Sequence, residues 1–109
     1  MIGHCMRRVT AVAVLSLLLT ALASIAFRAS RLEAQDARQR QAAADAYDKG
    51  TTAYVDQAYD EAAVWFETAN RLAPAAPALM QAIRAHEKNN NGARATTLAL
   101  ELQSAYRED

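Results

Sequence analysis

The chain is poor in the residues that small proteins use for catalysis, metal binding and covalent cross-linking. Its one cysteine, Cys5, excludes an internal disulfide. Only His4 and His86 could join that thiol, whereas a zinc site needs several such ligands held together. The three glycines are isolated, which excludes a glycine-rich phosphate loop. No nucleophile motif is recognisable either, so we expect no enzymatic activity, no metal and no cofactor.

Aromatic residues are also scarce, at 6%, and an excess of charge is absent, since twelve basic side chains balance twelve acidic ones. Without a basic surface, the chain is not expected to bind nucleic acid. Residues 35–109 are mildly acidic, with eleven carboxylates against eight basic side chains, which argues against anionic partners in general. The 109 residues suffice for one small domain at most.

An apolar run near the N-terminus predicts a targeting segment. Residues 9–27 carry no charge and follow Arg7 and Arg8, which is the order of features in a secretory signal peptide. Small residues at alternating positions predict three cleavage sites, before Ser24, Phe27 and Gln35. An uncleaved membrane anchor is the alternative, because a helix of this length spans roughly 28 Å, close to the hydrocarbon thickness of a bilayer.

This segment divides the chain into three parts: a signal peptide or membrane anchor over 1–26, a polar linker over 27–41 and a helical domain over 42–109. Cleavage would place the domain in a bacterial-type periplasm or outside the cell. Retention would leave it anchored in the inner membrane, with membrane contact only through residues 9–27. Arg28 and Arg31 count against export, since positive charge is disfavoured on the exported side.

Helical patterns dominate the remaining sequence, and no strand-like alternation follows Phe27. Four helices are expected, from Asp36 or Gln41 to Val55, Ala58 to Ala73, Pro77 to Lys88, and Ala93 to Tyr106. Prolines at 74 and 77 interrupt the helical pattern between the second and third helices, and the Asn-rich stretch 89–92 interrupts it between the third and fourth. Because short connections make neighbouring helices antiparallel, the predicted fold is all-α, with two antiparallel helical hairpins in series.

The first hairpin carries a pattern of small and aromatic residues. Tyr59, Ala62, Phe66, Ala69 and Ala73 recur at spacings of three and four, so they share one face of the second helix. Gly50 lies inside the first helix, where glycine costs about 1 kcal/mol relative to alanine. A close approach of the two helices at Gly50 would explain that residue, with the ring of Phe66 filling the space.

These residues resemble a tetratricopeptide repeat, a helix–turn–helix unit with a period of 34 residues. The matching string is Tyr47-Asp-Lys-Gly50-x3-Tyr54-x4-Tyr59-x2-Ala62-x3-Phe66-x2-Ala69-x2-Leu72-x-Pro74, and the resemblance covers about Ala43 to Ala76. The repeat core that it implies consists of Gly50, Tyr59, Ala62, Phe66, Ala69 and Pro74. A degenerate second repeat follows, with Arg84 or Ile83 at the place of Gly50 and no phenylalanine in its second helix.

The resemblance implies a concave surface, built from the first helix of each repeat, that binds a segment of another protein. The residues implied on this surface are Tyr47, Thr51, Tyr54, Val55, Gln81, Ala85 and Lys88. Tyr47 and Tyr54 can be interpreted either as binding residues or as half-buried packing residues. Trp65 lies off the patterned face of the second helix, and we expect it to pack near Leu79 or Ile83.

Two functions remain open at this point. The first is a non-enzymatic adaptor that binds a protein or peptide whose identity the sequence does not give. The alternative is a membrane-anchored spacer whose hairpins pack on copies of themselves to form a homo-oligomer. Both leave an open end to be covered, since repeat arrays usually need about three units for stability.

Overall fold

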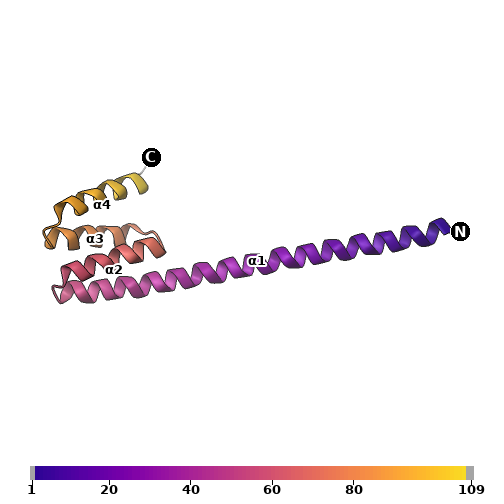
Figure 1. Ribbon diagram of the computed structural model, residues 1–109, viewed down its shortest axis with the longest axis horizontal. Coiled ribbons are helices and arrows are strands. Elements are labelled where there is room, and N and C mark those ends of the chain that lie inside the picture. Colours follow the sequence, from indigo (N-terminus) through magenta and orange to yellow (C-terminus); the bar gives the residue numbers. More distant parts are fainter. Residues whose placement is uncertain (1, 108–109) are drawn as a thin grey trace. The chain divides into compact units, whose positions relative to one another are not determined.

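The computed structural model describes the backbone of residues 2–107 and the side chains of residue 10 and residues 12–107. This part of the chain is helical apart from its turns and contains no strand, so the all-α prediction is confirmed. Figure 1 shows its helices, which are α1 (Ile2–Val55), α2 (Tyr59–Leu72), α3 (Ala76–Lys88) and α4 (Gly92–Ala105). The side chains of His4, Cys5, Arg7 and Arg8 lie outside the described residues.

Helix α1 differs most from what the sequence pattern predicts. The expected start was Asp36 or Gln41, whereas α1 begins at Ile2 and continues without a break through residues 27–41. That stretch has no proline or glycine and consists largely of alanine, arginine, glutamine, leucine and glutamate. These residues have high helix propensity, and polarity alone does not end a helix. The expected polar linker is therefore helical.

The chain divides into two compact units, Met1–Asp36 and Ala37–Asp109. In the first unit the large apolar side chains between Val12 and Phe27 are all exposed. By length and composition α1 could cross a membrane, and a signal sequence has the same properties. The prediction of an apolar N-terminal helix is confirmed, while the choice between cleavage and retention stays a prediction.

In the second unit the chain reverses direction at each turn, so that α3 packs between α2 and α4 (Figure 1). The largest fully buried side chains are Phe66, Leu79 and Leu98. Most other core positions are alanines, which allow the helices to approach closely. The main core cluster consists of Ala53, Ala62, Ala63, Phe66, Leu79, Ala82, Ala85 and Leu98.

The turns after α1 and after α3 share one backbone arrangement. Gln57 has φ 64° and Asn90 has φ 58°, the left-handed conformation that ends many helices. After α1, the Ala58 amide donates to the Ala53 carbonyl at 2.9 Å and the Gln57 amide to the Tyr54 carbonyl at 3.0 Å. After α3, the corresponding bonds join Asn91 to His86 at 2.8 Å and Asn90 to Glu87 at 3.2 Å. Both turns are therefore Schellman motifs.

The turn between α2 and α3 is built differently. The side-chain oxygen of Asn70 accepts a hydrogen bond from the Ala75 amide at 3.1 Å. Pro77 lies in the first turn of α3, where its missing amide hydrogen removes no helical hydrogen bond. The expected break around Pro74 and Pro77 is thus present.

Candidate protein-binding groove

Helices α1 and α2 are in close contact at Gly50. A Cβ atom added there would lie only 2.8 Å from Cδ1 and 2.9 Å from Cε1 of Phe66. Phe66 is buried, and its ring forms an edge-to-face contact with the ring of Tyr47, with the two centroids 5.2 Å apart. The absence of a side chain at residue 50 therefore lets the Phe66 ring lie directly against the α1 backbone, which is the close approach expected from the sequence.

A groove of about 380 Å³ lies beside this contact. Its floor includes Phe66, and its walls come from the C-terminal part of α1 and from α3. The residues that line it are Tyr47, Thr51, Tyr54, Val55, Phe66, Gln81 and Arg84. Five of the seven residues that the repeat resemblance implies on a concave surface thus share one groove: Tyr47, Thr51, Tyr54, Val55 and Gln81.

The two tyrosines of the groove both pack against the protein core and line the groove. Tyr47 and Tyr54 are both partly buried against the main core cluster. Tyr54 also contacts Tyr59 edge to face, with centroids 5.2 Å apart. Tyr47 additionally borders a second, mainly apolar groove of about 320 Å³ that includes Ala43, Ala69 and Pro77. The packing and binding interpretations of these tyrosines are therefore compatible.

The remaining two implied residues do not line the groove. Ala85 was expected on the binding surface, but it is fully buried in the core and cannot touch a partner, so that expectation is wrong. Its neighbour Arg84 is exposed and lines the groove instead. Successive residues of an α-helix are rotated by about 100° about its axis. A surface assignment that is shifted by one residue therefore selects a core residue in place of an exposed one. Lys88 is exposed at the end of α3, beyond the residues that line the groove.

A pattern in the sequence could have identified Arg84. Leu79, Ala82 and Ala85 recur every three residues and form the buried face of α3. Gln81 and Arg84 follow a parallel line along the adjacent face. Because arginine is almost never fully buried without a partner, its position fixes the register of this helix better than the alanines do.

The residues of the implied repeat core differ in burial. Gly50, Ala62, Phe66 and Ala69 are buried, and Tyr59 is partly buried. Pro74 is exposed in the turn between α2 and α3. The four buried residues hold α1 against α2 and thereby fix the α1 wall of the groove.

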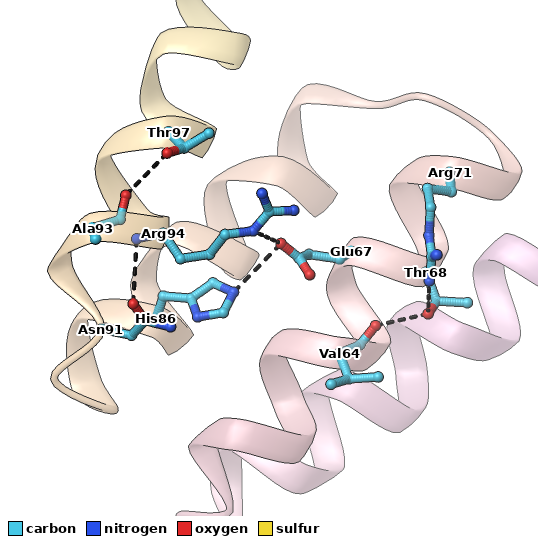
Figure 2. A network of polar contacts seen from close by, with 9 residues as sticks. All are labelled: Val64, Glu67, Thr68, Arg71, His86, Asn91, Ala93, Arg94 and Thr97. Atoms are coloured by element: carbon cyan, nitrogen blue, oxygen red, sulfur yellow. Dashed lines mark hydrogen bonds and ion pairs between the residues drawn. The ribbon is translucent and has the colours of Figure 1, made fainter.

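Polar side chains from α2, α3 and α4 meet around Glu67 (Figure 2). The guanidinium Nε of Arg94 donates to Oε1 of Glu67 at 2.8 Å. Nε2 of His86 lies 3.4 Å from the same oxygen, and this contact is an ion pair only when the imidazole is protonated. Neither ring nitrogen of His86 forms a hydrogen bond with the described residues, although both are buried. The sequence pattern did not indicate this network, because its members are far apart along the chain.

The surroundings of Trp65 also differ from expectation. It packs against the small cluster of Ala46, Ala69 and Ala78, whereas Leu79 and Ile83 belong with the main core cluster. The ammonium group of Lys49 on α1 lies 4.6 Å above the ring centroid. The indole therefore faces α1, because the alanines at 46 and 69 leave room for it there.

Within the described residues, no group of three or more His, Cys, Asp and Glu side chains is arranged to hold a metal ion. Comparisons of the chain with protein-family models, with curated proteins and with solved structures found no match. The chemistry of the groove can therefore be argued only from the side chains that line it.

Proposed function

We propose that this chain is a non-enzymatic adaptor that holds a segment of another protein in the groove between α1 and α3. The main support is the convergence of Tyr47, Thr51, Tyr54, Val55 and Gln81 on one groove. Tyrosine rings offer a large contact area at a low cost in conformational entropy. The hydroxyl of Thr51, the amide of Gln81 and the guanidinium of Arg84 can bind polar groups of an extended segment beside those rings.

The same proposal includes two tetratricopeptide-like repeats. Its support is that Gln57 and Asn90 end α1 and α3 in the same way, 33 residues apart, one fewer than the period of this repeat class. The same offset relates the buried Ala62 of α2 to the buried Ala95 of α4. With the same offset, Ile83 corresponds to Gly50, which agrees with a degenerate second repeat.

We further propose that the compact unit Ala37–Asp109 functions outside the cytoplasm. The apolar part of α1 supports this, since it is suited to an export signal or to a membrane anchor. A bacterial-type periplasm is the proposed compartment, reached either by cleavage after the apolar segment or with that segment retained in the inner membrane.

Site-specific photo-crosslinking in an exporting host tests the adaptor proposal. A photoreactive amino acid is placed at Thr51 or Gln81, both in the groove, and at Val64, which is exposed on α2 outside it. We expect one discrete adduct with another protein from the two groove positions and none from Val64. Adding Tyr54→Ala should reduce the adduct at least about fivefold, as expected for the loss of a tyrosine contact worth over 1 kcal/mol.

The outcome that would reject the adaptor is equally specific. Adducts of equal yield from all three positions would show non-specific proximity. An adduct with the mass of two copies of this chain would show self-association and would favour the spacer. The helical circular dichroism of Tyr54→Ala must match the wild type, so that a lost adduct reports on the groove and not on unfolding.

One observation favours the alternative function, the membrane-anchored spacer. Helix α1 runs unbroken from Ile2 to Val55, through all three sites at which cleavage is expected. Intact mass measurement of the protein from soluble and membrane fractions separates the two cases. A full-length species in the membrane fraction alone supports the anchored spacer, whereas a soluble species starting at Ser24, Phe27 or Gln35 supports a released adaptor.

A further inference from the structure

A third cavity, which shares no lining residue with the groove between α1 and α3, lies between α1 and α2. It has a volume of about 370 Å³, is open to solvent, and Trp65 is one of the residues that line it. Small residues, Ala53 and Ala58, form part of its wall. The other residues that line it are Asp48, Lys49, Thr52, Asp56 and Glu61. We call it the Trp65 cavity.

The Trp65 ring is already bound to a cation. Lys49 comes from the facing helix, and its Nζ atom lies 4.6 Å from the ring centroid. A cation within about 6 Å of an indole face is attracted by the negative charge density of that face. Trp65 is partly buried against Ala46, Ala69 and Ala78, and it also lines the cavity, as Lys49 does. Lys49 is exposed, and a lysine ammonium lies on a flexible four-carbon stem, so another cation can displace it.

Three carboxylates surround the same cavity. Asp48, Asp56 and Glu61 are exposed, and none of them forms an ion pair with a described basic side chain. The ammonium of Lys49 is thus held by the ring and by none of the three carboxylates, and the cavity keeps an excess of negative charge. A guanidinium group is well suited to such a place, because it stacks on an aromatic face and binds carboxylates through its edge.

We infer that the Trp65 cavity binds an arginine or lysine side chain from a basic segment of a partner protein. The incoming cation takes the place of Lys49 over the Trp65 ring, and its remaining donors bind Glu61 and Asp56. This binding is independent of the proposed groove function, because the two cavities share no lining residue. The chain would then hold two segments of opposite character, with Arg84 facing one and carboxylates facing the other.

Trp65 is the only tryptophan of the chain, so its fluorescence reports on this cavity directly. The full chain in uncharged detergent micelles is titrated with a capped Gly-Arg-Gly-Arg-Gly peptide. The matched peptide carries citrulline in place of arginine, which keeps the shape and removes the charge. We expect a saturable change of Trp65 fluorescence with the arginine peptide, weaker at high salt, and little change with the citrulline peptide.

Two acidic residues in the first turn of α2 give a matched pair of variants. Glu61 lines the cavity and Asp60 does not, while both lie in the same helical turn. Glu61→Gln should weaken binding of the arginine peptide about fivefold, and Asp60→Asn by less than about twofold. Lys49→Met removes the competing cation and should strengthen binding about two- to fivefold. This gain cannot result from a general loss of folding.

Several results would overturn the inference. Equal responses to the arginine and citrulline peptides would show that charge is not recognised. Equal effects of Glu61→Gln and Asp60→Asn, or weaker binding by Lys49→Met, would place the cation elsewhere. A change of Trp65 fluorescence when the protein concentration is raised without peptide would show that the cation belongs to a second copy of the chain and not to a separate partner.

Discussion

The contact between Gly50 and Phe66 makes a definite prediction about stability. In most helices, replacing an interior glycine by alanine stabilises the protein by about 1 kcal/mol, because alanine loses less backbone entropy on folding. At residue 50 the added Cβ would lie 2.8 Å from Cδ1, 2.9 Å from Cε1 and 3.1 Å from Cγ of Phe66. Two of these distances are shorter than non-bonded carbon atoms tolerate, so either the ring or the helix has to move.

Moving the Phe66 ring costs free energy, because the ring is buried and closely surrounded. Its side chain is only 2% exposed and is bordered by the ring of Tyr47. Adding a methyl group to a filled core of this kind typically costs about 1 to 3 kcal/mol. The steric cost outweighs the gain in helix propensity, so Gly50→Ala should lower the free energy of unfolding by about 1 to 2 kcal/mol. For a domain of this size the melting temperature should fall by about 5 to 15 °C.

Urea unfolding of the full chain in uncharged detergent, followed by Trp65 fluorescence, measures this change. Trp65 lies in the second unit, so its fluorescence reports on the unfolding of that unit. Gly92→Ala is the matched control, because a Cβ atom at Gly92 would meet nothing within 4 Å. Its free energy of unfolding should stay unchanged or rise by up to about 0.5 kcal/mol.

A double-mutant cycle shows whether the loss arises from the ring. With Phe66→Leu in place, the additional cost of Gly50→Ala should be smaller than in the wild type, because a leucine can rotate away. Equal or higher stability of Gly50→Ala relative to the wild type would refute the reasoning. So would strict additivity of the two substitutions, since the clash would then lie with another group.

Three further predictions concern other parts of the second unit. Gln57→Gly should raise the free energy of unfolding by about 0.5 to 1 kcal/mol, because glycine adopts φ 64° without strain, and a lower urea midpoint would contradict the left-handed turn. Leu98→Ala should cost about 2 to 5 kcal/mol and Leu100→Ala less than about 0.5 kcal/mol, since they are 2% and 62% exposed; equal losses would contradict the burial of α4. The side chains of Arg94 and Glu67 are 47% and 22% exposed, so a double-mutant cycle of the two should give a coupling of up to about 1 kcal/mol that falls with added salt; a coupling insensitive to salt would contradict this exposure.

The features predicted correctly from the sequence depend on local chemistry. Each end of α2, α3 and α4 lies within one residue of its expected place. Proline acts at its own position by removing an amide hydrogen and restricting φ, and asparagine and glycine act through their tolerance of left-handed backbone. Close packing at Gly50 was also predictable, because a glycine in a helix interior is unfavourable unless something needs the space.

The features missed depend on interactions that no local pattern fixes. The polarity of residues 27–41 suggested a linker, although their helix propensity was high throughout. On α3, the alanine-rich face left two registers open, and Ala85 was assigned to the groove in place of Arg84. The partner of Trp65 could not be deduced either, because it depends on how α1 and α2 are rotated relative to each other.

The close contact at Gly50 also limits how this sequence can vary in evolution. A side chain at residue 50 is compatible with the fold only if residue 66 becomes smaller, so the two positions should change together in related chains. A search for related chains should therefore accept a larger residue at position 50 wherever residue 66 is smaller, and should not require glycine and phenylalanine at both places.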